Sequence, residues 1–187
     1  SNHLRKRPEA SPCEIPVCRE LLAQVPILAN RSTPVQEIGV AYDPFTFKRR
    51  ETPEIELAPG LLCGGEQTVR VVVTRDTWDK VAPRIRPRDD VRPEAVYDDL
   101  NVYEIDPASD FKINCETQLV TVQDGLSLPP VTAFRLLAAK LQRLGLNNPI
   151  LLKDCLAFEP VPLSPEVALL RASVVIGSLL ADGIGDA

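Results

Sequence analysis

The stretch Gln118-Leu-Val-Thr-Val-Gln-Asp-Gly125 decides the fold that this sequence predicts. Its β-branched and apolar residues predict a strand over 118–123, which ends at the turn Asp124–Gly125. Residues 130–144 follow with apolar side chains at helical spacing, and Gly145 stands where a helix commonly ends. A strand followed by a helix begins a βαβ unit, and such units build parallel sheets.

The same alternation continues to the end of the chain. Ile150–Asp154 is predicted to be a second strand, and Ser164-Pro165-Glu166 supplies an N-cap, a first-turn proline and an acidic first turn for a helix through about residue 175. A third strand is predicted over Ser178–Ala181, before a turn rich in glycine and aspartate. Two βαβ units with right-handed crossovers and three parallel strands follow from this order.

The N-terminal half is less regular. Residues 14–25 are predicted to form a short amphipathic helix, because their apolar residues recur at helical spacing: Ile15, Cys18, Leu21, Leu22 and Val25. We therefore expect two regions. Residues 1–25 are a linker with the tail helix of a preceding unit, and residues 26–187 are an α/β domain.

Several shorter elements are expected within that domain. Extended structure is predicted over Tyr42–Leu57, a mostly buried strand over Thr68–Thr74, and a strand over Leu100–Ile105. A short helix is predicted over Asp76–Ile85, with Trp78, Val81 and Ala82 facing inward.

The number of residues limits the architecture. About 145 residues separate Tyr42 from Asp186, whereas a closed eight-unit barrel takes about 250 and rarely fewer than 200. The predicted fold class is therefore α/β, with βαβ units and a mostly parallel sheet. A partial TIM-barrel-like or open sheet of about four to six strands fits better than a closed barrel.

Composition excludes several classes of function. A net charge of −5 and a pI near 5.0 argue against a nucleic-acid partner. No apolar run approaches the roughly 18 residues that span a bilayer, and no signal peptide is visible, so we expect a cytoplasmic protein without a membrane partner. Because the chain lacks methionine and starts at Ser1-Asn2, we expect an excised segment.

The reactive side chains predict neither a catalytic centre nor a cofactor site. The five cysteines are an odd number and include no C-x-x-C pair, so neither a disulfide framework nor a metal site follows. His3, the sole histidine, lies in the polar terminus, where it supports no nucleophilic arrangement. No catalytic residue, cofactor ligand or metal ligand is predicted within this chain.

Four charged residues follow the predicted second and third strands: Lys153, Asp154, Asp182 and Asp186. Because ligands commonly bind at the carboxyl ends of parallel strands, these side chains are candidates for a small-anion or ligand site. The alternative is that they cap strand ends and pair with one another, and this structural interpretation is favoured.

The basic run Lys48-Arg49-Arg50 also has two interpretations. Arginine forks suit a diphosphate. An interdomain surface is favoured, since the aromatic residues Tyr42, Phe45 and Phe47 just ahead of the run suggest docking against a neighbouring domain.

Three segments, in their order along the chain, resemble the long form of the 4-hydroxy-3-methylbut-2-enyl diphosphate synthase family. Glu14–Leu22 is similar to the helix after the catalytic barrel of that enzyme. Tyr42–Thr52, with Gly64-Gly65 and the valine-rich run after it, is similar to the start of the domain inserted behind the barrel. Ile176–Asp186 is similar to the end of that insert.

The resemblance implies an iron–sulfur oxidoreductase of the non-mevalonate isoprenoid pathway, of which this chain is the inserted middle domain. The flanking barrel and iron–sulfur domains of the same polypeptide are its implied partners, and a homodimeric parent is compatible with it. The parent is expected to carry a 4Fe-4S cluster, but no C-P-x-C segment is present here. We therefore expect the segment alone to be inactive and to act as a structural spacer, with a regulatory anion-binding module near Lys153 and Asp182 as the alternative.

Overall fold

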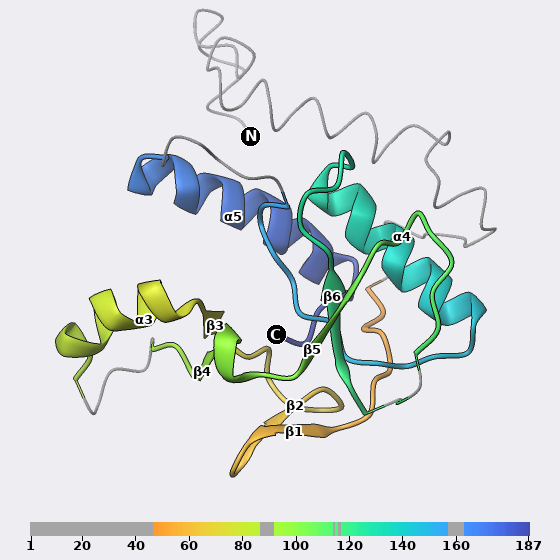
Figure 1. The fold of residues 1–187 in the computed structure, drawn as a ribbon, viewed down its shortest axis with the longest axis horizontal. Helices are drawn as coiled ribbons and strands as arrows, with labels where there is room; N and C mark the ends of the chain where they lie inside the picture. The colour runs from red at the N-terminus through yellow and green to blue at the C-terminus, as the bar shows by residue number, and fades with distance from the viewer. Residues whose placement is uncertain (1–46, 87–91, 114, 116, 157–162) are drawn as a thin grey trace, which may run out of the picture.

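The structure, a computed structural model, describes residues 47–86, 92–113, 115, 117–156 and 163–187. The helix predicted over 14–25, the first part of the extended segment from Tyr42 and the boundary proposed after residue 25 lie outside these residues. Figure 1 shows two long helices on one side of the central strands and a hairpin on the other.

Short elements make up the first part of the described chain. They are β1 (Ile55–Ala58), β2 (Leu61–Cys63), β3 (Val72–Val73), α3 (Arg75–Val81), a 3-10 turn (Ala82–Arg84), β4 (Ala95–Val96), a second 3-10 turn (Tyr97–Asp99) and β5 (Val102–Ile105). The later part contains β6 (Leu119–Val122) and the helices α4 (Pro130–Arg143) and α5 (Pro165–Ala181).

The strands pair mostly in parallel. β5 lies parallel to β6, with Val102 opposite Leu119 and Ile105 opposite Val122, and β3 lies parallel to β4, whereas β1 and β2 form an antiparallel hairpin. On its other side β6 has a parallel bridge from Val120 to Ile150. The fold is therefore mixed α/β with short parallel sheets, and the described residues form no closed barrel, as predicted.

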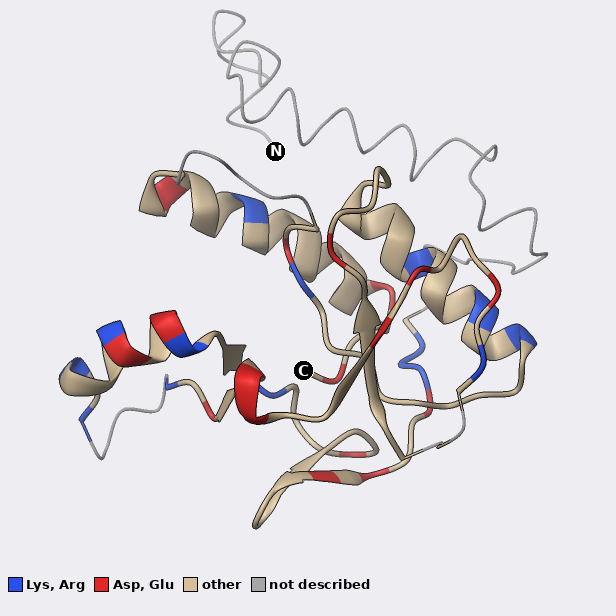
Figure 2. Cartoon of the chain, viewed as in Figure 1, with Lys and Arg blue, Asp and Glu red and all other residues tan. Residues whose placement is uncertain are grey.

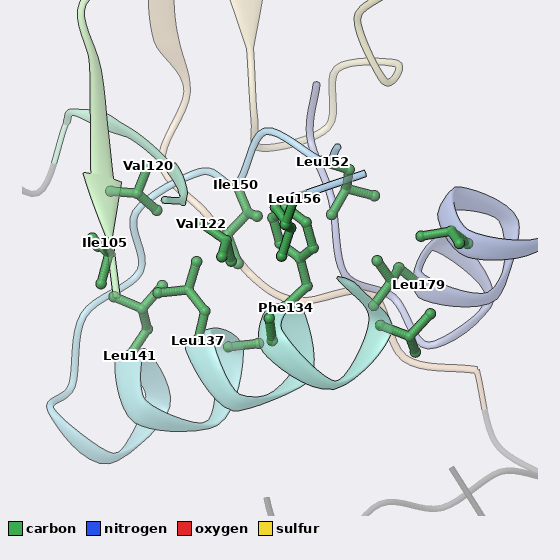
Figure 3. Close-up of a cluster of buried hydrophobic side chains, with 14 residues drawn as sticks. Ile105, Val120, Val122, Phe134, Leu137, Leu141, Ile150, Leu152, Leu156 and Leu179 are labelled. Atoms are coloured by element: carbon green, nitrogen blue, oxygen red, sulfur yellow. The ribbon is translucent and has the colours of Figure 1, made fainter. Parts of the chain in front are cut away.

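Helix α4 covers one face of these strands. Its apolar residues point toward β5, β6 and residues 150–152, and Phe134, Leu137 and Leu141 are fully buried there (Figure 3). The helix predicted over 130–144 is thus confirmed, and Gly145 adopts the positive φ of +70° that commonly ends a helix. The opposite face packs against the β1–β2 hairpin through Leu119, Leu151 and a few neighbours.

The third predicted strand, Ser178–Ala181, is wrong. These residues form the last turn of α5, which begins at the N-cap Ser164 and ends before Gly183 at φ +76°. An apolar run of this length suits a strand or a buried helical turn equally, and Val175 and Leu179, four residues apart, are the two that α5 buries.

The extended segment that the sequence placed at 178–181 lies instead at residues 184–187. Asp186 N–H donates to the carbonyl of Ile150 at 2.8 Å, and Leu152 N–H donates to the carbonyl of Ala187 at 2.7 Å. Residues 150–152 and 186–187 therefore run in the same direction. These two hydrogen bonds join residues 186–187 to residues 150–152, but residues 184–187 form none of the strands of the described chain.

The strand predicted over Thr68–Thr74 is shorter and less buried than expected. Only Val72 and Val73 belong to β3, and the side chains of Val69 and Val71 are 38% and 51% exposed. A strand presents alternate residues to opposite faces, and here one face is left uncovered by the described residues. The helix predicted over Asp76–Ile85 exists as α3 and a 3-10 turn, but it buries none of its residues.

Two further sequence expectations concern β5 and membrane-spanning structure. The strand expected over Leu100–Ile105 is confirmed as β5. Among the described helices, none is long and apolar enough to cross a bilayer.

Replacing Phe134 by alanine tests the core beneath α4. We expect Phe134→Ala to lower the free energy of unfolding by about 3–5 kcal/mol, because the fully buried ring leaves a cavity between α4 and the strands. Leu144→Ala is the matched control, since Leu144 is 54% exposed at the end of the same helix and should change stability by less than about 0.5 kcal/mol. Urea unfolding measures both, and equal losses would contradict this packing.

Candidate functional site

The carboxylate of Asp186 is buried and accepts three hydrogen bonds. Its Oδ1 accepts hydrogen bonds from Arg49 Nη2 at 3.3 Å and from Thr52 Oγ1 at 3.0 Å, and its Oδ2 accepts from the backbone N–H of Ile150 at 3.0 Å. The Asp186 side chain is 3% exposed. We refer to Arg49, Thr52, Ile150 and Asp186 as the Asp186 network.

The backbone of Asp186 is engaged as well. Its carbonyl accepts from Arg70 N–H at 3.0 Å and from the Cys63 thiol at 3.3 Å, in addition to the bond that its own N–H donates to Ile150. One residue thereby holds four segments that are far apart in the sequence. A buried carboxylate requires such complete hydrogen bonding, since an unpaired one is very costly.

Arg50 joins the same region to the loop before residue 150. Its guanidinium donates to the carbonyls of Asn148 at 2.5 Å and Leu146 at 2.8 Å, and its backbone N–H donates to Gly183 at 2.9 Å. Burial lowers the pKa of Arg50, and the nearby Asp186 carboxylate opposes this change. Two residues of the basic run predicted as an interdomain surface therefore bind within the chain, while Lys48 is exposed.

The strand predicted over Ile150–Asp154 is reduced in the described chain to the bridge of Ile150 to Val120, and Lys153 follows it near the ends of β5 and β6. Its ammonium lies 2.9 Å from Asp124 Oδ1, 3.6 Å from Glu104 Oε1 and 5.8 Å from the centre of the Tyr97 ring. Tyr97 in turn donates its hydroxyl to Glu104 at 2.6 Å. Burial, followed by this hydrogen bond, raises the pKa of Tyr97. We refer to Tyr97, Glu104, Asp124 and Lys153 as the Lys153 cluster.

The charges of the Lys153 cluster bear on what it can bind. Glu104 and Asp124 together carry two negative charges and Lys153 carries one positive charge, so an incoming anion meets a net negative group. Asp124 is 65% exposed and Glu104 is 41% exposed, so these pairs contribute little to stability. The arrangement positions Lys153 but leaves its charge neutralised by the chain itself.

The other two predicted site residues pair elsewhere. Asp154 accepts from Arg171 Nε at 3.0 Å, which connects the loop after residue 152 to α5. Asp182 is the C-cap of α5 and accepts from Arg135 Nε of α4 at 2.6 Å, with a second contact from Arg135 Nη2. Each of the four predicted residues thus lies in a separate contact, and the structure does not gather them into one site.

The cysteine side chains of the described residues do not suit a metal centre. Cys63 is buried against the Asp186 carbonyl, and burial, reinforced by the Asp186 charge, raises the pKa of its thiol to about 11. Metal ions and iron–sulfur clusters bind the thiolate, which is therefore scarce here near neutral pH. Among the described residues no three histidine, cysteine or acidic side chains lie close enough to hold a metal ion, so these residues do not fit an iron–sulfur cluster.

A shallow pocket of about 300 Å³ lies between the β1–β2 hairpin and the start of β6. Ile55, Leu57, Leu100 and Leu119 supply much of its lining, and Glu56 is its one charged residue. None of the predicted site residues lines it. Its remaining lining residues are polar, namely Asn101, Cys115, Thr117 and Gln118, so the pocket is of mixed character.

Sequence reasoning missed the partners of the predicted residues. Thr52, Arg135 and Glu104 lie 134, 47 and 49 positions from the residues that they bind, so local spacing carries no signal for them. Only Glu104 could be suspected from the sequence. It lies near the end of the strand predicted over Leu100–Ile105, and such a strand can pair with the next predicted strand, 118–123.

Comparison with known proteins gives one similar protein. The chain is 34% identical over 190 aligned residues to 4-hydroxy-3-methylbut-2-en-1-yl diphosphate synthase (flavodoxin) of Akkermansia muciniphila, and the match covers 92% of this chain and 32% of the relative. The chain therefore spans about a third of the relative's length, and the similarity supports membership of that enzyme family. No family model and no solved structure matches.

Removing the Asp186 carboxylate tests its structural role. Asp186→Ala leaves the buried N–H of Ile150 and the Thr52 hydroxyl without their acceptor, so we expect the free energy of unfolding to fall by about 3 kcal/mol. Asp154→Ala is the control, because Asp154 is 31% exposed and its pair with Arg171 should be worth less than about 1 kcal/mol. Chemical denaturation measures the free energy of unfolding of both variants. A decrease for Asp186→Ala as small as that for Asp154→Ala would contradict the structural role of the Asp186 network.

The raised pKa of the Cys63 thiol leads us to expect that the free energy of unfolding falls at alkaline pH. Its pKa of about 11 in the folded chain exceeds the ordinary value of 9.0, so between these pH values the unfolded chain binds fewer protons and is favoured as the pH rises. Cys63→Ser retains a donor for the Asp186 carbonyl without this ionisation. We expect the stability of this variant to fall less steeply from pH 9 to 11, whereas the exposed-site control Cys115→Ser should follow the unsubstituted chain.

Proposed function

We propose that this chain is a segment of a 4-hydroxy-3-methylbut-2-en-1-yl diphosphate synthase, and that it forms the domain inserted between the substrate-binding barrel and the iron–sulfur domain. The 34% identity over 92% of the chain supports this family assignment. The resemblance of Tyr42–Thr52 and Ile176–Asp186 to the two ends of the insert supports the place of the segment within the enzyme.

One structural observation carries the proposal of an inserted domain. The first and last described segments lie against each other, since Arg49 and Thr52 bind Asp186 and Arg50 donates to Gly183. Domains whose ends lie close together are tolerated as insertions, because they add a unit without separating the flanking parts of the host. This geometry supports the proposal of an insert, since it is compatible with flanking domains on both sides.

We propose that the inserted domain is a non-catalytic spacer. Its charged side chains support this role, because the predicted ligand residues Lys153, Asp154, Asp182 and Asp186 are each paired within the chain. A spacer of this kind sets the distance and orientation between the barrel, where substrate binds, and the cluster domain. The flanking domains of the same polypeptide are then its partners.

The 4Fe-4S cluster proposed for the complete enzyme would be held outside the described residues. Such a cluster supplies electrons to an oxidoreductase when it is bound. The described residues supply no group of ligands for it, and Cys63 is committed to the Asp186 carbonyl. We therefore assign no reaction step to this segment.

A small-anion module near Lys153 and Asp182 is the competing function. The position of Lys153 at the carboxyl ends of parallel strands favours it, because that edge is the usual ligand position in α/β sheets. The two carboxylates that bind Lys153, and the separate pairing of Asp182 with Arg135, are unfavourable to it.

The two functions are distinguished by Lys153→Met in the complete polypeptide that carries this segment. A spacer predicts that kcat/KM for the synthase reaction stays within about twofold of the unsubstituted enzyme. It also predicts that inorganic diphosphate, titrated into this chain by calorimetry, shows no saturable binding. Saturable binding that Lys153→Met abolishes, or a large loss of activity at unchanged thermal stability, would instead establish the anion module.

A further inference from the structure

Helix α5 presents an uncharged, largely apolar stripe on its surface. Leu169, Leu170 and Val174 are 69%, 41% and 39% exposed, and the same face continues through small exposed residues: Ser173, Gly177 and Ala181. Figure 2 shows that after the band of Arg171 the helix carries no further charge. We refer to these six residues as the α5 stripe. A surface helix normally places charged and polar side chains on such a face.

Gly177 adds a second, independent observation. A Cβ placed on this residue meets nothing within 4 Å, and its φ is not positive, so no contact or backbone conformation in the described chain requires glycine there. Glycine weakens the interior of a helix relative to alanine. Ser173, Gly177 and Ala181 follow one another at intervals of four residues, so small exposed side chains lie in a row along the helix. A glycine in such a row permits the close approach of another backbone.

The sequence pattern of residues 14–25 suits a helix that covers the α5 stripe. Their apolar side chains recur at helical spacing, from Ile15 to Val25, and would form one face of a helix. Twelve helical residues extend about 18 Å, and the α5 stripe from Leu169 to Ala181 spans thirteen residues and about 20 Å. The two apolar surfaces therefore match in length.

The chain between residue 25 and the described residues is long enough for residues 14–25 to reach the α5 stripe. The described chain begins beside the C-terminal end of α5, where a Cβ on Gly183 would lie 2.1 Å from the carbonyl oxygen of Lys48. Twenty-two residues, 26–47, separate Val25 from Lys48. They span up to about 70 Å, whereas α5 is about 26 Å long. The segment can therefore reach any part of the stripe within the same chain.

We propose that residues 14–25 dock as a helix on the α5 stripe, with Cys18, Leu21 and Leu22 toward Leu170, Val174 and Gly177. This contact explains both the missing charge on α5 and the glycine at 177. It does not depend on the proposed enzyme family.

Disulfide trapping in the full 187-residue chain tests the docking. Cys13, Cys115 and Cys155 are replaced by serine, which leaves Cys18 and the buried Cys63, and a partner cysteine is added by Ser173→Cys on the stripe. Gln142→Cys is the matched control, because Gln142 is exposed near the end of α4 and outside the stripe. Under a mild oxidant, docking predicts an intramolecular Cys18–Cys disulfide that forms at least about tenfold faster with Ser173→Cys, owing to its higher effective concentration.

Peptide mapping of the monomer band identifies the bond. Equal rates for the two positions would overturn the proposal. A disulfide that forms only between two chains would also overturn it, because a second copy would then cover the stripe.

Gly177→Gln provides a second test that does not depend on cysteine geometry at position 173. The longer side chain fits the open helix surface of the described chain but blocks the close approach of a docked helix. We expect it to slow trapping of Cys18 by about tenfold, while Gly177→Ala slows it much less. An unchanged trapping rate with a higher unfolding temperature for Gly177→Gln would show that nothing covers this face.

Discussion

The buried carboxylate of Asp186 is the interaction on which the rest of the structure depends. The chain places a charge where only 3% of the side chain meets solvent, and it does so one residue before the final alanine. A charge in that position is tolerated only with complete hydrogen bonding. Arg49, Thr52 and the Ile150 N–H supply it, and each comes from a different part of the chain from Asp186 itself. The network therefore ties these segments to one another in the folded chain.

This constraint explains the order of the parallel strands. Residues 184–187 cannot pair with residues 150–152 unless α5 ends at Gly183 and turns the chain back, and the positive φ of that glycine permits the turn. Arg50 closes the same corner by donating to the Gly183 carbonyl. The electrostatic network and the backbone hydrogen bonds of residues 184–187 thus belong to one arrangement.

The elements with strong local periodicity could be predicted, and those decided by distant contacts could not. Residues 130–144 and 118–123 were predicted correctly, because their patterns repeat over several turns or alternate cleanly. Residues 178–181 were assigned the wrong structure, because a short apolar run fits either state and only the position of Leu179 against α4 decides between them. The candidate site failed for the same reason: Asp182 and Arg135 meet through the packing of two helices, which spacing along the chain cannot reveal.

The pairing of charges also bears on what kind of surface this domain offers to others. A side chain that binds a ligand needs hydrogen-bond donors or acceptors that the protein itself does not occupy. Arg49, Arg50 and Asp186 instead form their hydrogen bonds within the chain. What remains on α5 is apolar and nearly uncharged, so contacts made there would depend on shape and burial rather than on ion pairs. Shape-dependent contacts fix orientation closely, because apolar surfaces in contact pack at high density and resist sliding. A domain that must hold its neighbours at a set distance benefits more from such a surface than from an exchangeable ionic one.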